Sequence, residues 1–299
     1  MQKLFENCRR SVLKENVYSE EMHAFIQYSY ELDNLIEHKK ITLREKHSRL
    51  YRFFKNNNFT CLGEGLTRAA YQSPGGEVVK IVRSVYDKAI GENKKEIRKF
   101  NQFNLDAFPK IEAYDDRDYL WFIVEYVEQI GKGHNSIERY KMLFPKLFTI
   151  SDQFREKIAN NFEPTSIIGN ELQKFARSRH KTHDINNTVK ILLKYKWNVT
   201  KLYRSDYPPS GGIKHGMVVV SALLQFSTYK LYKDPEGQRL HKDALSALFK
   251  YYENPDPNFA RLLEAMRVAN VNPDDFHSNN LGFNEKKVIK IIDAGFGHD

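Results

Sequence analysis

Two stretches near the C-terminal end decide the expected fold: Asp275-Phe-His-Ser-Asn-Asn280-Leu-Gly-Phe283 and Val288-Ile-Lys-Ile-Ile-Asp293-Ala-Gly295. Their spacing predicts a short loop, a tight hairpin and a second strand that ends in a carboxylate. Phosphoryl transfer needs such a set: one aspartate orients the attacking hydroxyl, while an asparagine and a second aspartate hold Mg²⁺ on the ATP phosphates. Asp275, Asn280 and Asp293 are the candidates for these roles.

A matching set stands in the N-terminal half. Gly63 and Gly65 can let the backbone approach phosphates, and the apolar strand that follows carries Lys80, which can meet them. A lysine among apolar β-branched residues needs a buried acidic partner. We expect Glu96 on the next helix, with Glu92 one turn earlier as the rival. Removal of Lys80 is then expected to leave Glu96 unpaired.

With these motifs the chain resembles the protein kinase-like superfamily. The Asp-x-His-x-x-Asn pattern at 275–280 is closer to that of aminoglycoside phosphotransferases and phage-encoded serine/threonine kinases than to the His-Arg-Asp of eukaryotic kinases. Together with Leu62–Tyr71 it is most similar to small phage kinases. The resemblance covers residues 59–128 and 259–297. It departs from the pattern at Arg68, which stands where the third loop glycine is expected.

The resemblance implies an α+β, bilobal protein kinase-like fold. Its parts would be an N-terminal helical extension (1–56), a small antiparallel β-lobe (57–128) and a large, mostly helical lobe (129–299). ATP and Mg²⁺ would be the cofactors, and a serine or threonine of a host protein would be the phosphate acceptor, in the host cytoplasm. The implied roles are catalysis by Asp275 and Lys80, metal binding by Asn280 and Asp293, and nucleotide binding by Gly63, Gly65, Lys80, Glu96 and the backbone from Glu125 to Val127.

Two other functions stay open. One is a small-molecule phosphotransferase of the aminoglycoside kinase type, with an acidic acceptor pocket in the segment 130–270. The other is a pseudokinase that acts by binding, which Arg68 and the absence of an activation segment after Gly295 support. An argument against the pseudokinase is that an inactive site has no physical reason to retain all four of Lys80, Asp275, Asn280 and Asp293.

The formal net charge of +9 favours acidic partners: nucleoside phosphates, acidic protein surfaces or nucleic acid. The densest basic cluster is Arg177–His183. We interpret it as a solvated helix end rather than a nucleic-acid contact, because no nucleic-acid motif accompanies it, and we expect it to favour acidic protein substrates. The apolar run 217–226 is too short to span a bilayer. Two cysteines and no signal peptide indicate a reduced, cytoplasmic protein.

The first 55 residues are expected to be helical. Ser19 can cap one helix, and Thr42 with Glu45 forms a capping box that opens a second. These helices either pack on the small lobe, which we favour, or serve as a dimerisation or regulatory arm. Most of the segment 130–270 is expected to be helical as well.

Overall fold

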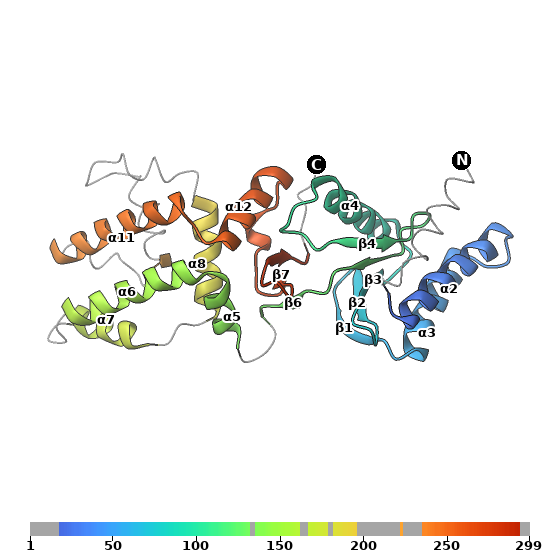
Figure 1. The fold of residues 1–299 in the computed structure, drawn as a ribbon, viewed down its shortest axis with the longest axis horizontal. Coiled ribbons are helices and arrows are strands. Elements are labelled where there is room, and N and C mark those ends of the chain that lie inside the picture. The colour runs from blue at the N-terminus through green and yellow to red at the C-terminus, as the bar shows by residue number, and fades with distance from the viewer. Residues whose placement is uncertain are drawn as a thin grey trace. The chain divides into compact units, whose positions relative to one another are not determined.

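The computed structural model describes residues 18–131, 135–161, 167–178, 182–195, 222–223 and 235–293. The protein is α+β, with antiparallel sheets and several helices (Figure 1). It divides into two compact units, Met1–Tyr126 and Val127–Asp299, and each is described by itself.

The first unit is built on a five-stranded antiparallel sheet with strand order β1-β2-β3-β5-β4. The helix α4 (Asp87–Phe103) connects β3 to β4, and an asparagine in left-handed conformation, Asn104, ends it. The strands are β1 (Thr60–Glu64), β2 (Arg68–Gln72), β3 (Val78–Val82), β4 (Ile111–Tyr114) and β5 (Trp121–Val124).

Both faces of this sheet are covered, which explains why every residue of β3 and β5 is buried and why all of them except Lys80 are apolar. The N-terminal helices α2 (Glu20–Glu37) and α3 (Leu43–Asn56) belong to the core on one face, where side chains such as Val79 and Ile81 are buried. Ile97 of α4 belongs to the cluster on the other face, with Val78, Phe122 and Val124. Along β5 the faces alternate as the pleat requires, with Trp121 and Ile123 in the first cluster and Phe122 and Val124 in the second.

The predicted caps of the N-terminal helices are confirmed. The Ser19 side chain accepts a hydrogen bond from the Met22 N–H at 3.3 Å. The Thr42 hydroxyl accepts from the Glu45 N–H, and the Glu45 carboxylate accepts from the Thr42 N–H at 2.7 Å. These helices pack on the small sheet, as we favoured, and supply much of its core.

A buried lysine ties these helices to the turn between β4 and β5. Lys46 is fully buried, and its Nζ lies 2.5 Å from Asp33, 3.1 Å from Asp115 and 2.9 Å from Asp118. Asp115 also accepts from the Leu120 N–H. Ion pairs of Lys46 therefore link α2, α3 and the turn at 115–118.

The second unit is mainly helical, as predicted for the part of 130–270 that the structure describes. Residues 196–221 and 224–234 lie outside that part, and they include most of the apolar run 217–226. The helices are α5 (Ser136–Leu143), α6 (Pro145–Asn161), α7 (Ile167–Arg177), α8 (Thr182–Tyr195), α11 (Pro235–Glu253) and α12 (Pro257–Ala269).

A small three-stranded antiparallel sheet completes this unit. Its strands are β6 (Glu128–Gln129), β7 (Leu281–Phe283) and β8 (Ile289–Ile291), in the order β6-β7-β8. Gly282 is required there by close approach, because an added Cβ would lie 2.6 Å from the Glu128 carbonyl oxygen. Asn258 fixes the hairpin by accepting from the Ile289 N–H at 3.0 Å and donating to the Lys287 carbonyl.

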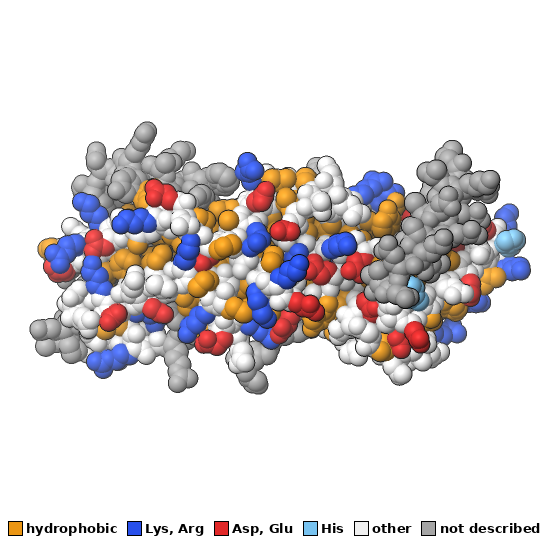
Figure 2. Space-filling view, in the orientation of Figure 1, with side chains coloured by type: hydrophobic (Ala, Val, Ile, Leu, Met, Phe, Trp, Pro, Cys, Tyr) orange, Lys and Arg blue, Asp and Glu red, His pale blue; other side chains and the backbone are white. Residues whose placement is uncertain are grey.

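Positive and negative side chains are interspersed over the described surface on the face that Figure 2 shows. The excess of 47 lysines and arginines over 38 acidic residues is therefore not gathered into one patch on that face. Among the described helices, none is both long enough and apolar enough to cross a bilayer.

Candidate functional site

The first unit brings Lys80 and Glu96 together. Lys80 is on β3 and its Nζ lies 2.9 Å from Glu96 Oε1, on α4. Both residues are buried, with 8% and 2% of their surface exposed. Glu92 is one turn earlier and half-buried, so the structure pairs Lys80 with the expected glutamate rather than with its rival.

Arg68 contacts the same carboxylate. Its Nη1 donates to Oε2 of Glu96, whereas Lys80 contacts Oε1. The expectation that removal of Lys80 would leave Glu96 unpaired is therefore wrong. The sequence marked Arg68 only as a departure from the glycine pattern, and nothing in its spacing indicated which acidic group it would contact.

The two glycines of the loop are not required by the fold. A Cβ added at Gly63 would meet no atom within 4 Å, and one at Gly65 would meet only the Arg68 carbonyl oxygen, at an ordinary 3.6 Å. Their backbone conformations are also open to other residues, since neither is among the residues of positive φ in the described chain. Crowding and backbone conformation therefore do not explain these glycines, but the close approach of a ligand to the backbone would.

The loop itself is a short, braced turn between β1 and β2. The Gly65 N–H donates to the Arg68 carbonyl at 2.7 Å, and Arg83 Nη1 donates to the Gly65 carbonyl at 2.9 Å. At its tip, the Leu66 side chain is 98% exposed. The loop thus projects an apolar side chain from a turn whose base is held by hydrogen bonds.

The predicted adenine-binding segment begins where the first unit ends. Glu125 follows β5 and its N–H donates to the Lys110 carbonyl at 2.9 Å. Because this N–H already donates to Lys110, a backbone contact from Glu125 to a ligand would use the Glu125 carbonyl oxygen. Val127 belongs to the second unit.

In the second unit, a compact loop carries Asp275. The short 3₁₀-helix η3 (Pro273–Asp275) starts at Asn272, whose side chain accepts from the Asp274 N–H at 3.0 Å. The His277 N–H donates to the Asp275 carbonyl, and the His277 carbonyl accepts from the Asn280 N–H at 2.8 Å. These bonds fold the expected loop on itself and lead into β7.

The backbone also brings the two expected metal ligands close together. The Ile292 N–H donates to the Asn280 carbonyl at 2.7 Å, which places Asp293 one residue beyond this contact. Asn280 is half-buried and Asp293 is exposed. An amide and a carboxylate are oxygen ligands of the kind that Mg²⁺ accepts in proteins, so the chemistry of this pair fits the expected ion.

Burial raises the pKa of the Asp275 carboxyl above its ordinary value; His277 and Lys190 oppose this shift, and Asp293 and Asp274 add to it. A raised pKa is what a proton acceptor needs to work near neutral pH. Lys190, from α8, donates to the Asp274 carbonyl at 3.1 Å. This neighbour of the loop was not foreseen, because it comes from a helix about 85 residues away in sequence.

One group of carboxylates in the described chain has the geometry of a cation site: Asp33, Asp115 and Asp118. It lies in the core of the first unit, and the Lys46 ammonium stands among the three. The cluster thus already holds its cation, and we assign it a structural role.

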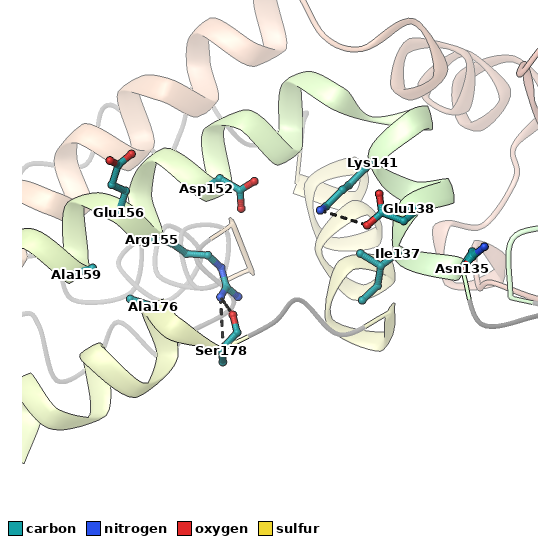
Figure 3. Close-up of a pocket in the computed structure, with 10 residues that line it drawn as sticks. All are labelled: Asn135, Ile137, Glu138, Lys141, Asp152, Arg155, Glu156, Ala159, Ala176 and Ser178. Carbon is teal, nitrogen blue, oxygen red and sulfur yellow. Dashed lines mark hydrogen bonds and ion pairs between the residues drawn. The ribbon is translucent and has the colours of Figure 1, made fainter.

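The second unit also has a surface cavity of about 720 Å³ between α5, α6 and α7. Figure 3 shows that Glu138, Asp152 and Glu156 line it with Lys141 and Arg155. Arg155 donates to carbonyls at the end of α7, including that of Ser178 at 2.7 Å, and Lys141 pairs with Glu138 at 3.4 Å. The expected site residues do not line this cavity.

The basic cluster 177–183 is described only in part. Arg177 is the last residue of α7 and is exposed, as a solvated helix end requires. Arg179, His180 and Lys181 lie outside the described residues.

No protein-family model matches the chain, and no curated protein matches it in sequence.

Proposed function

We propose that the chain is an ATP- and Mg²⁺-dependent phosphotransferase of the bilobal, protein kinase-like fold, with a serine or threonine of a protein as its acceptor. The observation that carries the proposal is the buried Lys80–Glu96 pair, 2.9 Å long, between a central strand and the helix that follows it. In phosphotransferases of this kind such a pair aligns the α- and β-phosphates.

Three further features support it. Gly63 of β1 and Lys80 of β3 both pair with Ala70 of β2, so they lie at the same level of the sheet with one strand between them. Gly63 and Gly65 stand where the fold does not need glycine. In the second unit, the hairpin β7–β8 connects Asn280 to Asp293, and Asp275 opens the loop before it.

The proposed chemistry is in-line transfer of the γ-phosphoryl group. Asp275 would orient the acceptor hydroxyl and take its proton, which suits its raised pKa. Asn280 and Asp293 would hold Mg²⁺, which offsets the phosphate charge. Lys80, fixed by Glu96, would align the phosphates, and the loop from Gly63 to Gly65 would cover them.

The direct test has two steps. The protein is titrated with ATP in the presence and absence of Mg²⁺ while its melting temperature is followed, and then incubated with γ-labelled ATP and a lysate or purified candidate proteins. We expect Mg²⁺-dependent stabilisation and label on serine or threonine. Stabilisation without label in any acceptor would favour the pseudokinase.

The cavity in the second unit favours one alternative acceptor. Three carboxylates and two cationic side chains line it, which suits a small polycation better than an acidic protein surface. Transfer to an aminoglycoside or a polyamine derivative that bears a hydroxyl, abolished by Asp152→Asn with Glu156→Gln, would establish that the acceptor is a small molecule. Transfer to protein that the double variant leaves unchanged would exclude it.

A further inference from the structure

Arg68 and Lys80 project from the same face of the sheet. In the antiparallel pairing of β2 with β3, Arg68 is opposite Val82 and Ala70 is opposite Lys80. Arg68 is therefore the diagonal neighbour of Lys80, two residues along the ladder. Side chains at such diagonal positions are within reach of each other when they are long. Both face α4, which carries Glu96.

The two cations divide the Glu96 carboxylate between them. Lys80 contacts Oε1 and Arg68 contacts Oε2. The side chains of Glu96 and Arg68 are only 3% and 13% exposed. Charge-assisted hydrogen bonds in such surroundings are stronger than those at the surface, so the contacts from both sides contribute to the position of the carboxylate.

A contact from Lys80 alone would restrain the Glu96 carboxylate less. The terminal torsion of a glutamate side chain is soft, and a carboxylate that pairs through one oxygen can rotate and draw the lysine with it. A guanidinium on the second oxygen opposes that rotation. It also links β2 directly to α4, so that strand, helix and lysine are held in one arrangement before any ligand arrives.

We propose that Arg68 is a positioning residue: it locks Glu96 from the side of β2 and thereby sets the place of the Lys80 ammonium for the phosphates. The inference rests on the proposed function. It gives a role to the one residue of the glycine loop that departs from the family pattern, and that role is exerted through Glu96 rather than by contact with the nucleotide.

The test is a double-mutant cycle between Arg68 and Glu96. The variants are Arg68→Ala, Glu96→Ala and the double variant, with Arg68→Lys as the conservative change. The matched control is Arg98→Ala, since Arg98 is exposed on α4. For each protein the affinity for Mg-ATP, the rate of γ-phosphate transfer at saturating ATP and the melting temperature are measured. Glu96→Gln replaces Glu96→Ala if the latter does not fold.

We expect Arg68→Ala to lower the transfer rate by about tenfold, a coupling in the range of contacting charged residues. Arg68→Lys should recover part of the loss, and Arg98→Ala should match the wild type. In the Glu96→Ala background, removal of Arg68 should have no further effect on rate or affinity, because the proposed route through Glu96 is gone.

Each other outcome overturns the inference. If the losses from Arg68→Ala and Glu96→Ala multiply in the double variant, Arg68 acts independently of Glu96. If Arg68→Ala transfers phosphate like the wild type, or loses only melting temperature, its role is not positioning. A wild-type protein that does not bind Mg-ATP overturns the proposed function as well, and this result is distinguished by the wild-type titration alone.

Discussion

The Nζ atom of Lys80 lies 2.9 Å from Oε1 of Glu96, in a region of the first unit where both side chains are largely buried. This pair joins the central strand β3 to the only helix inserted between strands of the described small sheet. Because Arg68 contacts the other carboxylate oxygen, the pair is part of a cluster of one anion and two cations.

The cluster predicts that loss of Lys80 and loss of Glu96 reduce the free energy of unfolding by different amounts. Lys80→Met keeps the contact between Arg68 and Glu96 and should reduce stability by no more than about 1 kcal/mol, the centre of the range for single substitutions. Glu96→Ala leaves two largely buried cations without their shared carboxylate and should cost about 3 kcal/mol, as for other broken buried pairs. Urea unfolding of both variants measures the difference. Equal losses, or a larger loss for Lys80→Met, would contradict the geometry.

Alanine substitutions at the two loop glycines are expected to affect Mg-ATP binding but not the stability of the fold. Gly63→Ala and Gly65→Ala should change the free energy of unfolding by less than about 0.5 kcal/mol, since the added Cβ has room. Both should weaken Mg-ATP binding, because the methyl group occupies space proposed for phosphate.

Gly282→Ala is the matched control for these two variants. There the added Cβ meets the Glu128 carbonyl oxygen at 2.6 Å, so stability should fall by about 1–3 kcal/mol. Calorimetry of the three variants together with ATP titration provides the comparison. Loop variants that lose stability but bind ATP normally would show that these glycines serve the fold.

The Lys46 cluster predicts a pH dependence of stability. Burial, helped by Asp115 and Asp118 and opposed by Lys46, raises the pKa of Asp33 to about 6. An unfolded aspartate titrates near pH 4, so the folded protein binds the proton more tightly. The resulting stabilisation is complete below about pH 4 and is lost as the pH rises through 6.

Asp33→Asn should remove most of this dependence of stability on pH. Between pH 5 and pH 7 the wild type should lose stability on the order of 1 kcal/mol from this group, and the variant should lose less. The control is Glu31→Gln, which changes an exposed glutamate on the same helix. Urea midpoints at pH 5, 6 and 7 test this; parallel slopes for wild type and Asp33→Asn would refute it.

Much of the first unit could be predicted from local signals. The apolar runs of β3 and β5 identify buried strands, and the capping box at Thr42 marks the start of α3 at Leu43. The pairing of Lys80 with Glu96 also followed from sequence, because a buried lysine needs a carboxylate and few were near. These are short-range or strongly constrained features.

The contacts that the sequence did not indicate are long-range. Lys46 meets Asp115 across 69 residues, and Lys190 reaches Asp274 across 84. Such pairs depend on how helices pack, which periodicity does not specify. The contact of Arg68 with Glu96 was not foreseen for a related reason: whether its long side chain reaches α4 depends on the register of β2 with β3, which the glycine pattern does not specify.

Asp293 gives the most direct test of the proposed Mg²⁺-dependent phosphotransfer. Asp293→Asn removes a charged ligand of the proposed ion, and the exposed side chain should leave the fold intact. The measurement is the rate of γ-phosphate transfer by wild type and Asp293→Asn across a Mg²⁺ titration, with circular dichroism as the control for folding. The account predicts Mg²⁺-dependent transfer by the wild type and a loss of about 10²-fold or more in the variant. Equal rates for the two proteins, or a wild-type rate indifferent to Mg²⁺, would contradict it.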